Sequence, residues 1–253
     1  MPLNDEQLLR YSRQIMLPNV DVAGQERLLT ARVLLVGIGG LGAPVAMYLA
    51  ASGVGHLVLA DDDSVELSNL QRQIIHDNDS LGMTKVASAA KRLSRLNPEI
   101  AISTIDHRPS RDELYEQIRL ADAVVDATDN FETRFLLNEI CVQEHTPLIS
   151  GAAIRTEGQV AVFLPGDDQP CYRCLYHEGP EVEETCSENG VLSPLVGIIG
   201  SIQAMETVKV LLAIGKTLTG RLLVLDALEM EWRTIKLKKD PACPVCSHSS
   251  VKK

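Results

Sequence analysis

The stretch 32-RVLLVGIGGLG-42 decides the fold, because a short apolar run ends directly at a glycine-rich loop. The run Arg32–Val36 predicts a buried strand, and residues 41–52 predict a helix with Pro44 in its first turn, where proline is tolerated. Between them the sequence fits G-x-G-x-x-G with a fourth glycine inside the motif: Gly37, Gly39, Gly40 and Gly42. Such glycines allow a tight turn and a close backbone approach to phosphate, so the unit indicates nucleotide binding rather than a purely structural turn.

An acidic residue lies where this interpretation needs one. Asp61 follows the next predicted strand, His56–Ala60, 24 residues after Gly37. At that position a carboxylate can accept hydrogen bonds from ribose hydroxyls. The loop and Asp61 together predict a nucleotide site but do not say which nucleotide it takes, and an NAD-dependent oxidoreductase is the default alternative.

Strands and helices alternate on both sides of this unit. We predict helices over 6–16, 84–96, 112–120 and Phe131–Glu144, and strands over Ala101–Ile105, Ala123–Asp126 and 147–150. The first of these helices carries Arg10 and Arg13, three residues apart and therefore on one face. Alternation at this spacing predicts a Rossmann-like α/β fold, with a mostly parallel sheet covered by helices on both faces.

The pattern changes beyond about residue 157. Strands over 159–164, 222–226 and 232–237 predict antiparallel pairing, with a long helix over 194–213 among them. No linker separates domains. We therefore predict one domain over 1–253, made of an N-terminal helical arm (1–30), a nucleotide-binding core (31–157) and a C-terminal elaboration (158–253) with a mobile loop at 177–190.

Composition excludes several classes of function. The chain has 253 residues, 4% of them aromatic, and a formal net charge of -10, which argues against nucleic-acid binding. The acidic N-terminus lacks the apolar core of a secretory signal. The most apolar stretch, 191–214, contains Gln203, Glu206 and Lys209, which are costly in a bilayer, so we expect a buried helix, no membrane span and a cytoplasmic protein.

Two cations point to the phosphates of the nucleotide. Lys85 stands in the first turn of a predicted helix, where a cation opposes the helix macrodipole unless an anion is near. With Arg72 in 68-SNLQRQ-73 it favours a bound phosphate tail, and two extra cations suit a triphosphate better than a pyrophosphate bridge.

Asp129 follows the strand Ala123–Asp126 at the edge where ligands of such folds bind. For it two interpretations stay open: a Mg²⁺ ligand, or part of the capping box 129-DNFE-132.

Four of the six cysteines form two C-x2-C pairs: Cys171 with Cys174, and Cys243 with Cys246. Four thiolates satisfy tetrahedral Zn²⁺ and leave no open position, so the predicted metal is structural and would tie the C-terminal tail to the middle of the chain. Disulfides or a redox pair are the alternatives, and disulfides are disfavoured in a cytosolic protein.

The other two cysteines differ from each other. Cys141 falls in an apolar helical pattern and is expected to be a buried small hydrophobe. Cys186 lies in an acidic stretch that should be exposed, where neighbouring carboxylates raise a thiol pKa. The residues alone therefore predict that Cys186 is accessible but not activated as a nucleophile.

These motifs occur together and in order, and with them the chain resembles the bacterial E1-like adenylyltransferases of the MoeB/ThiF/HesA group. The resemblance runs from 10-RYSRQ-14 to Cys246 and includes the glycine loop, 61-DDD-63, 68-SNLQRQ-73, 128-TDN-130, 150-SGAA-153 and both cysteine pairs. It implies that Mg-ATP is used to adenylate the C-terminal Gly-Gly carboxylate of a small ubiquitin-like sulfur carrier, releasing pyrophosphate. It displaces the oxidoreductase interpretation.

The resemblance also implies roles for individual residues. Arg13 corresponds to an arginine that reaches the phosphates of a neighbouring subunit, so a homodimer is implied, and Cys186 corresponds to a cysteine that forms a covalent sulfur-transfer intermediate in some members. Zn²⁺ is implied on the four paired cysteines and Mg²⁺ on Asp129. The residues expected at the nucleotide are Gly37, Gly39, Gly40, Gly42, Asp61, Asp63, Ser68, Asn69, Leu70, Gln71, Arg72, Lys85, Asp129 and Asn130.

The pathway is left between two alternatives. Residues 59-LADDD-63 look like the thiazole-pathway enzymes, whereas 150-SGAAIRTEGQ-159 looks like the molybdopterin-pathway enzymes, which we favour. Only seven residues follow Cys246, so sulfur is expected to come from another protein, a sulfurtransferase or a cysteine desulfurase. A non-catalytic zinc scaffold that binds the carrier is a further alternative, which the intact Arg13, Arg72, Lys85 and Asp129 disfavour.

Overall fold

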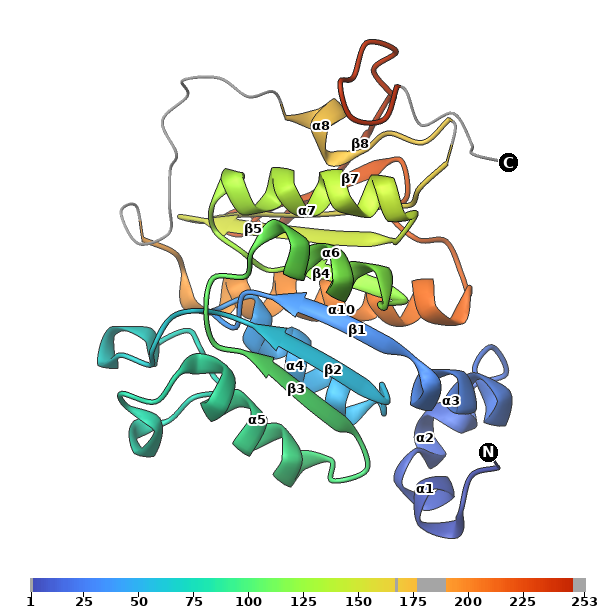
Figure 1. Ribbon diagram of the computed structural model, residues 1–253, viewed down its shortest axis with the longest axis vertical. Helices are drawn as coiled ribbons and strands as arrows, with labels where there is room; N and C mark the ends of the chain where they lie inside the picture. Colours follow the sequence, from blue (N-terminus) through green and yellow to red (C-terminus); the bar gives the residue numbers. More distant parts are fainter. Residues whose placement is uncertain (1, 167, 177–189, 248–253) are drawn as a thin grey trace.

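Eight strands form one sheet in the computed structural model, which describes residues 2–166, 168–176 and 190–247 (Figure 1). Across the sheet the strands are β3 (Ala101–Ile105), β2 (His56–Ala60), β1 (Arg32–Val36), β4 (Ala123–Asp126), β5 (Leu148–Ile154), β6 (Glu157–Phe163), β7 (Arg221–Asp226) and β8 (Glu231–Lys236). β3 to β5 are parallel, and β5 to β8 pair antiparallel. The predicted fold class, with its antiparallel C-terminal strands, is confirmed.

Neighbouring residues of β1 point to opposite faces of the sheet, so both faces are covered. Val33 and Leu35 pack into one core cluster and Leu34 and Val36 into the other, as the two-residue repeat of a strand requires. The first cluster lies under α4 (Gly42–Ala51), α5 (Lys85–Leu96) and α10 (Ser193–Leu212), and the second under α6 (Arg111–Arg119) and α7 (Phe131–Glu144) (Figure 1). A continuous apolar strand is explained by this burial on both sides.

The apolar helix α10 belongs to the first of these layers. By length and composition it could cross a membrane, but half of its most apolar window is buried within the protein. It packs on α4, β4, β5 and β6, and its polar residues Gln203 and Glu206 are buried there. The predicted buried helix is confirmed.

The N-terminal arm differs from its prediction. The single helix expected over 6–16 is split into α1 (Asp5–Arg10) and α2 (Ser12–Ile15), because Tyr11 turns into the core, where it is 2% exposed and accepts a hydrogen bond from Asn97. Arg10 and Arg13 therefore lie in different helices, and Arg10 donates to the carbonyl of Leu96. A further helix, α3 (Asp21–Thr30), was not predicted.

The strand order places two loops side by side. β1 lies between β2 and β4. The chain leaves β1 and β4 at the same edge of the sheet, but the helix after β1 covers one face of the sheet and the helix after β4 covers the other. This reversal is the place where α/β sheets bind ligands. β5 is longer than predicted and forms a hairpin with β6, so the sheet continues across residue 157, and the division of the chain into a core and an elaboration remains a prediction.

Candidate functional site

The glycine loop turns between β1 and α4 at this edge of the sheet. Gly37 has a φ of +90°, and a Cβ there would lie 2.6 Å from the carbonyl oxygen of Ala127 at the end of β4. A Cβ on Gly42 would lie 1.9 Å from the carbonyl oxygen of Gly37. These two glycines are required by the turn itself. Gly40 packs on Val196 of α10, whereas the nearest atom to a Cβ on Gly39 is the amide nitrogen of Gln73, at 3.5 Å.

Asp61 joins the loop to two charged neighbours. Its carboxylate accepts hydrogen bonds from the backbone amides of Ile38 (2.6 Å) and Asp63 (3.0 Å). Lys85 Nζ lies 3.9 Å from Asp61 Oδ1 and 2.7 Å from Asp63 Oδ2. Burial raises the pKa of Asp61, and Lys85 and the two amides oppose that rise. The lysine at the start of α5 is thus compensated by carboxylates, and the structure brings three predicted residues together.

The segment 68–73 lies beside them, anchored by its own hydrogen bonds. Around η1 (Leu67–Asn69), Asn69 Oδ1 accepts from the amide of Glu66 at 3.1 Å, and Arg72 Nη1 donates to the carbonyl of Ser68 at 3.1 Å. The hydroxyl of Ser193, at the start of α10, donates to the carbonyl of Gln71. Arg72 is therefore held on a short turn that is hydrogen-bonded to α10. Leu70, in the same segment, is half-buried.

Two buried residues near the loop were not predicted as site residues. His76 is 7% exposed, and its Nε2 lies 3.2 Å from the carbonyl of Ile38 while Nδ1 lies 2.8 Å from Ser88 Oγ. Since a carbonyl only accepts, Nε2 carries the proton, and burial lowers the pKa of this imidazole. Gln73 is 4% exposed, and its side-chain oxygen has no hydrogen-bond partner among the described residues. The sequence signal for both residues is their position: Gln73 ends the segment 68-SNLQRQ-73, and His76 follows it by three residues.

The structure shows which residue caps α7, the helix that follows β4. Asn130, not Asp129, caps α7: Asn130 Oδ1 accepts from the amide of Thr133 at 2.9 Å. The side chain of Asp129 is exposed at the same edge of the sheet as the glycine loop. Its carboxylate is thus not needed to start the helix. The side-chain oxygen of Asn130 is used by the cap. The predicted contact of Asn130 with the nucleotide remains a prediction.

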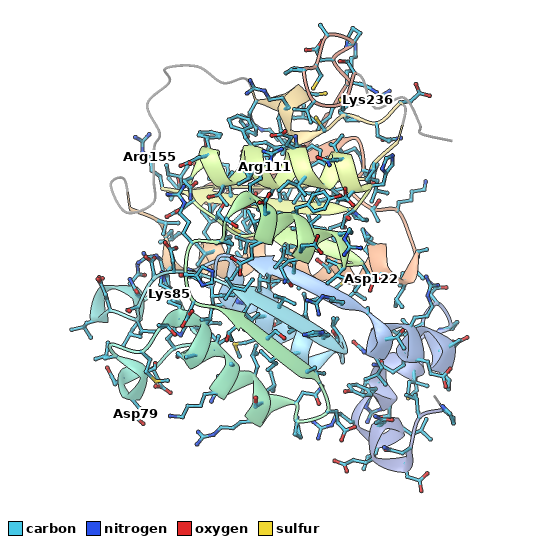
Figure 2. All side chains as sticks on the ribbon, viewed as in Figure 1. Asp79, Lys85, Arg111, Asp122, Arg155 and Lys236 are labelled. Carbon is cyan, nitrogen blue, oxygen red and sulfur yellow. The ribbon has the colours of Figure 1, made fainter. Side chains whose placement is uncertain are left out.

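Arg13 lies at the other edge of the sheet. Its helix α2 packs on α3, and Gln14 donates to the carbonyl of Ser52, in the turn before β2. The strands span about 16 Å from that edge to the glycine loop. Figure 2 shows the same separation, with Lys85 at the carboxyl edge and Asp122, whose carboxylate accepts from the amide of Arg32, at the amino edge. Arg13 is exposed and does not reach the predicted nucleotide site of its own chain.

The four paired cysteines come together as predicted. Their sulfur atoms all lie within 4.8 Å of one another, with 3.7 Å between Cys171 and Cys243 and 3.5 Å between Cys174 and Cys246. A disulfide needs a bond of about 2.05 Å, whereas sulfurs around a tetrahedral zinc ion stand about 3.8 Å apart. The donor set and its spacing therefore fit Zn²⁺ and not two disulfides.

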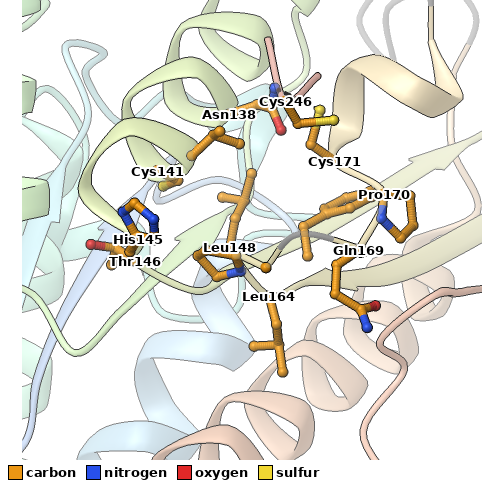
Figure 3. A pocket seen from close by; sticks show the side chains of 14 residues that line it. Asn138, Cys141, His145, Thr146, Leu148, Leu164, Gln169, Pro170, Cys171 and Cys246 are labelled. Carbon is orange, nitrogen blue, oxygen red and sulfur yellow. Dashed lines mark hydrogen bonds between the residues drawn. The ribbon is translucent and has the colours of Figure 1, made fainter. Parts of the chain in front are cut away.

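The cysteine cluster is separate from the edge of the sheet that carries the glycine loop. It joins α8 (Tyr172–Leu175) to the C-terminal tail, and Asn138 of α7 donates to the sulfur of Cys171 at 3.6 Å. A pocket beside it is lined by Cys141, His145 and Gln169 among others, and by no residue predicted to contact the nucleotide (Figure 3). Cys141 is buried, and burial raises its pKa, as expected of an inert thiol. Cys186, with most of the predicted loop 177–190, lies outside the described residues.

The chain matches known proteins over most of its length. A family model described as the ThiF family matches residues 11–245. The "Molybdopterin-synthase adenylyltransferase" of Escherichia coli is 48% identical over 96% of this chain and 98% of its own length. The "Sulfur carrier protein ThiS adenylyltransferase" of Escherichia coli is 43% identical over 98% of this chain and 99% of its own.

A solved structure supports the fold. The crystal structure titled "E. coli MccB + ATP" aligns with a TM-score of 0.81 and 25% identity, covering 94% of this chain and 75% of that one. That protein is similar to this chain in architecture, and its title describes a complex with ATP.

Proposed function

The chain belongs to the ThiF family, and from this premise we propose that it adenylates the C-terminal carboxylate of a small ubiquitin-like sulfur-carrier protein. ATP is the second substrate and pyrophosphate the other product. The observation that carries the proposal is the meeting of the glycine loop, Asp61 and Lys85 at the sheet's switch point, close to the loop that carries Asp129. Relatives of nearly equal length are named adenylyltransferases, which sets the oxidoreductase and scaffold alternatives aside.

The chemistry suits the charges at this edge. The carrier's carboxylate is already ionised, so no general base is needed, and its attack on the α-phosphate displaces pyrophosphate. The obstacle is repulsion between anions, together with charge that develops on the leaving group. Lys85 and Arg72 supply positive charge there, and the amides at the start of α4 face the phosphates. We assign Asp61, whose carboxylate also accepts from the amide of Ile38, to the ribose hydroxyls.

Asp129 is the residue that would hold Mg²⁺. Magnesium is commonly bound by one or two carboxylates together with substrate phosphates and water, so one exposed carboxylate beside a nucleotide site fits that donor set. The bound ion would neutralise phosphate charge. The buried side-chain oxygen of Gln73, unpartnered among the described residues, adds an acceptor for a donor group of the nucleotide.

The remaining assignments follow the same premise. Zn²⁺ on the four paired cysteines is structural, and sulfur reaches the activated carrier from a separate sulfurtransferase or cysteine desulfurase, with Cys186 as the candidate for a covalent intermediate. We place the enzyme in the cytoplasm and the molybdopterin pathway. Identity of 48% to the molybdopterin-synthase enzyme against 43% to the ThiS enzyme supports that pathway.

Carrier-dependent ATP–pyrophosphate exchange tests the function. We expect exchange with a molybdopterin-pathway carrier and much less with a thiazole-pathway carrier. Removing the carrier's last glycine should abolish exchange, because the attacking carboxylate no longer reaches the α-phosphate. A folded, zinc-loaded protein that exchanges pyrophosphate with neither carrier would refute the proposed activity. Equal exchange with both would refute only the pathway.

Arg13 provides a test of the homodimer. We propose that it completes the site of a partner subunit, since it cannot reach its own. Arg13→Ala and Asp129→Ala proteins should each be nearly inactive. After mixing and subunit exchange, one site in each mixed dimer has both residues, so activity should return to about a quarter of the wild-type value. No recovery in mixed dimers demonstrated by mass spectrometry would show that Arg13 does not act across an interface.

A further inference from the structure

A buried ion pair lies directly behind the loop that carries Asp129, and the proposed chemistry gives it no role. Asp126, the last residue of β4, is 0% exposed, and Arg134 in the second turn of α7 is 7% exposed. Arg134 Nε lies 3.9 Å from Asp126 Oδ2. A buried ion pair often adds little to stability compared with apolar residues of similar volume. Its presence at this position therefore calls for another explanation.

Arg134 binds the backbone on both sides of the site. Its Nη2 donates to the carbonyl of Thr128, the residue before Asp129, and to the carbonyl of Gly151 on β5 at 3.2 Å. The amide of Arg134 in turn donates to the carbonyl of Asn130. One side chain thus joins the loop after β4 to the neighbouring strand, and it acts on the residues that flank Asp129.

Asp126 completes the arrangement from the other side. Its Oδ1 accepts from the amide of Thr128 at 3.1 Å and from the Thr128 hydroxyl at 2.7 Å, while Oδ2 accepts from the hydroxyl of Ser150 at 2.7 Å. From α10, Gln203 Nε2 donates to the carbonyl of Asp126 at 2.7 Å. Both the side chain and the backbone of Asp126 are therefore fixed, and Thr128 is held by Asp126 and Arg134 together.

We infer that Arg134 is a positioning residue, which, with Asp126, fixes the loop so that the Asp129 carboxylate is presented to the metal–nucleotide complex. The inference rests on the proposed function, because it assigns Asp129 to Mg²⁺. Residues that orient a metal ligand from behind commonly change metal affinity or activity by about 10- to 100-fold when replaced. Arginine is suited to this role because its planar group makes several directed hydrogen bonds at once.

The test compares two arginine-to-lysine variants of the full-length protein. Arg134→Lys keeps the charge but replaces the planar guanidinium, whose Nη2 donates to both carbonyls, with a shorter side chain that ends in a single ammonium. Arg111→Lys is the matched control: Arg111 also binds two acceptor atoms, both on Glu139 of α7, but the pair is exposed. Mn²⁺ binding in the presence of a non-hydrolysable ATP analogue is followed by electron paramagnetic resonance. The Mg²⁺ dependence of ATP–pyrophosphate exchange is measured beside it.

We expect Arg134→Lys to weaken Mn²⁺ binding and raise the half-saturating Mg²⁺ concentration by about tenfold or more, with less change in exchange at saturating Mg²⁺. Arg111→Lys should match wild type. Thr128→Val, which keeps the side chain's shape but loses its bond to Asp126, should shift both values in the same direction.

Wild-type metal binding in a folded Arg134→Lys protein would overturn the inference. If that variant does not fold, wild-type binding in Thr128→Val would overturn it instead. Failure of the proposed function looks different, because the wild-type protein itself would then show no carrier-dependent exchange.

Discussion

Replacing Asp129 with alanine is expected to lower carrier-dependent ATP–pyrophosphate exchange by at least about a hundredfold. The variant would lose the one carboxylate proposed to bind Mg²⁺ at the phosphates. Lys85 would remain, but it is already paired with Asp63 at 2.7 Å and cannot replace a divalent ion. The exchange rate at saturating ATP and carrier measures the effect, and raising Mg²⁺ should restore little of it.

The same substitution should leave the fold intact. Asp129 is exposed, and Asn130 rather than Asp129 caps α7, so its loss removes no described hydrogen bond of the cap. The thermal midpoint and dimer mass should match wild type. Asp106→Ala is the matched control, because Asp106 follows β3 at the same edge of the sheet and is also exposed. Normal exchange by Asp129→Ala, or an equal loss in Asp106→Ala, would contradict the metal-ligand assignment.

Local sequence patterns were sufficient for the regular elements of the core. The bounds predicted for β1 to β4 and for α7 agree with the structure. β1, β2 and β4 are short apolar runs that are buried almost throughout, whereas the edge strand β3 is largely exposed. The prediction of a single N-terminal helix was wrong. No local pattern shows that Tyr11 is buried in the core, where it accepts a hydrogen bond from Asn97, 86 residues further along the chain.

The candidate site divides in the same way. Asp61 could be predicted because it follows the glycine loop and the next strand at the expected spacing. Lys85 could be predicted because a lysine in the first turn of a helix indicates a nearby anion. Arg134 and Gln203 could not, since each acts through a contact with a strand that is distant in the chain. An arginine in the second turn of a helix is an ordinary surface residue unless the neighbouring strand is known to lie against it. For Asp129, the sequence left two roles open, and the cap geometry of Asn130 removed one of them.

Loss of zinc is expected to have the largest effect on stability. Cys174→Ala removes one of four sulfurs that lie within 4.8 Å of one another, and Cys174 is only partly buried, so little packing is lost with it. Structural zinc contributes its binding free energy to folding. We therefore expect a loss of at least about 3 kcal/mol, and a thermal midpoint lower by about 6 to 12 °C for a chain of this size.

Zinc content and thermal unfolding, measured on the same samples, decide this prediction. Wild type should carry about one zinc ion per chain, and Cys174→Ala should lose most of it. Cys141→Ala is the control: Cys141 is buried but outside the cluster, so that variant should keep its zinc and lose only packing energy. Below its lower melting temperature, Cys174→Ala should still catalyse exchange, because the cluster contacts α7 through Asn138 rather than through Asp129. An unchanged thermal midpoint in a zinc-free variant would show that the four cysteines do not hold the C-terminal tail in place.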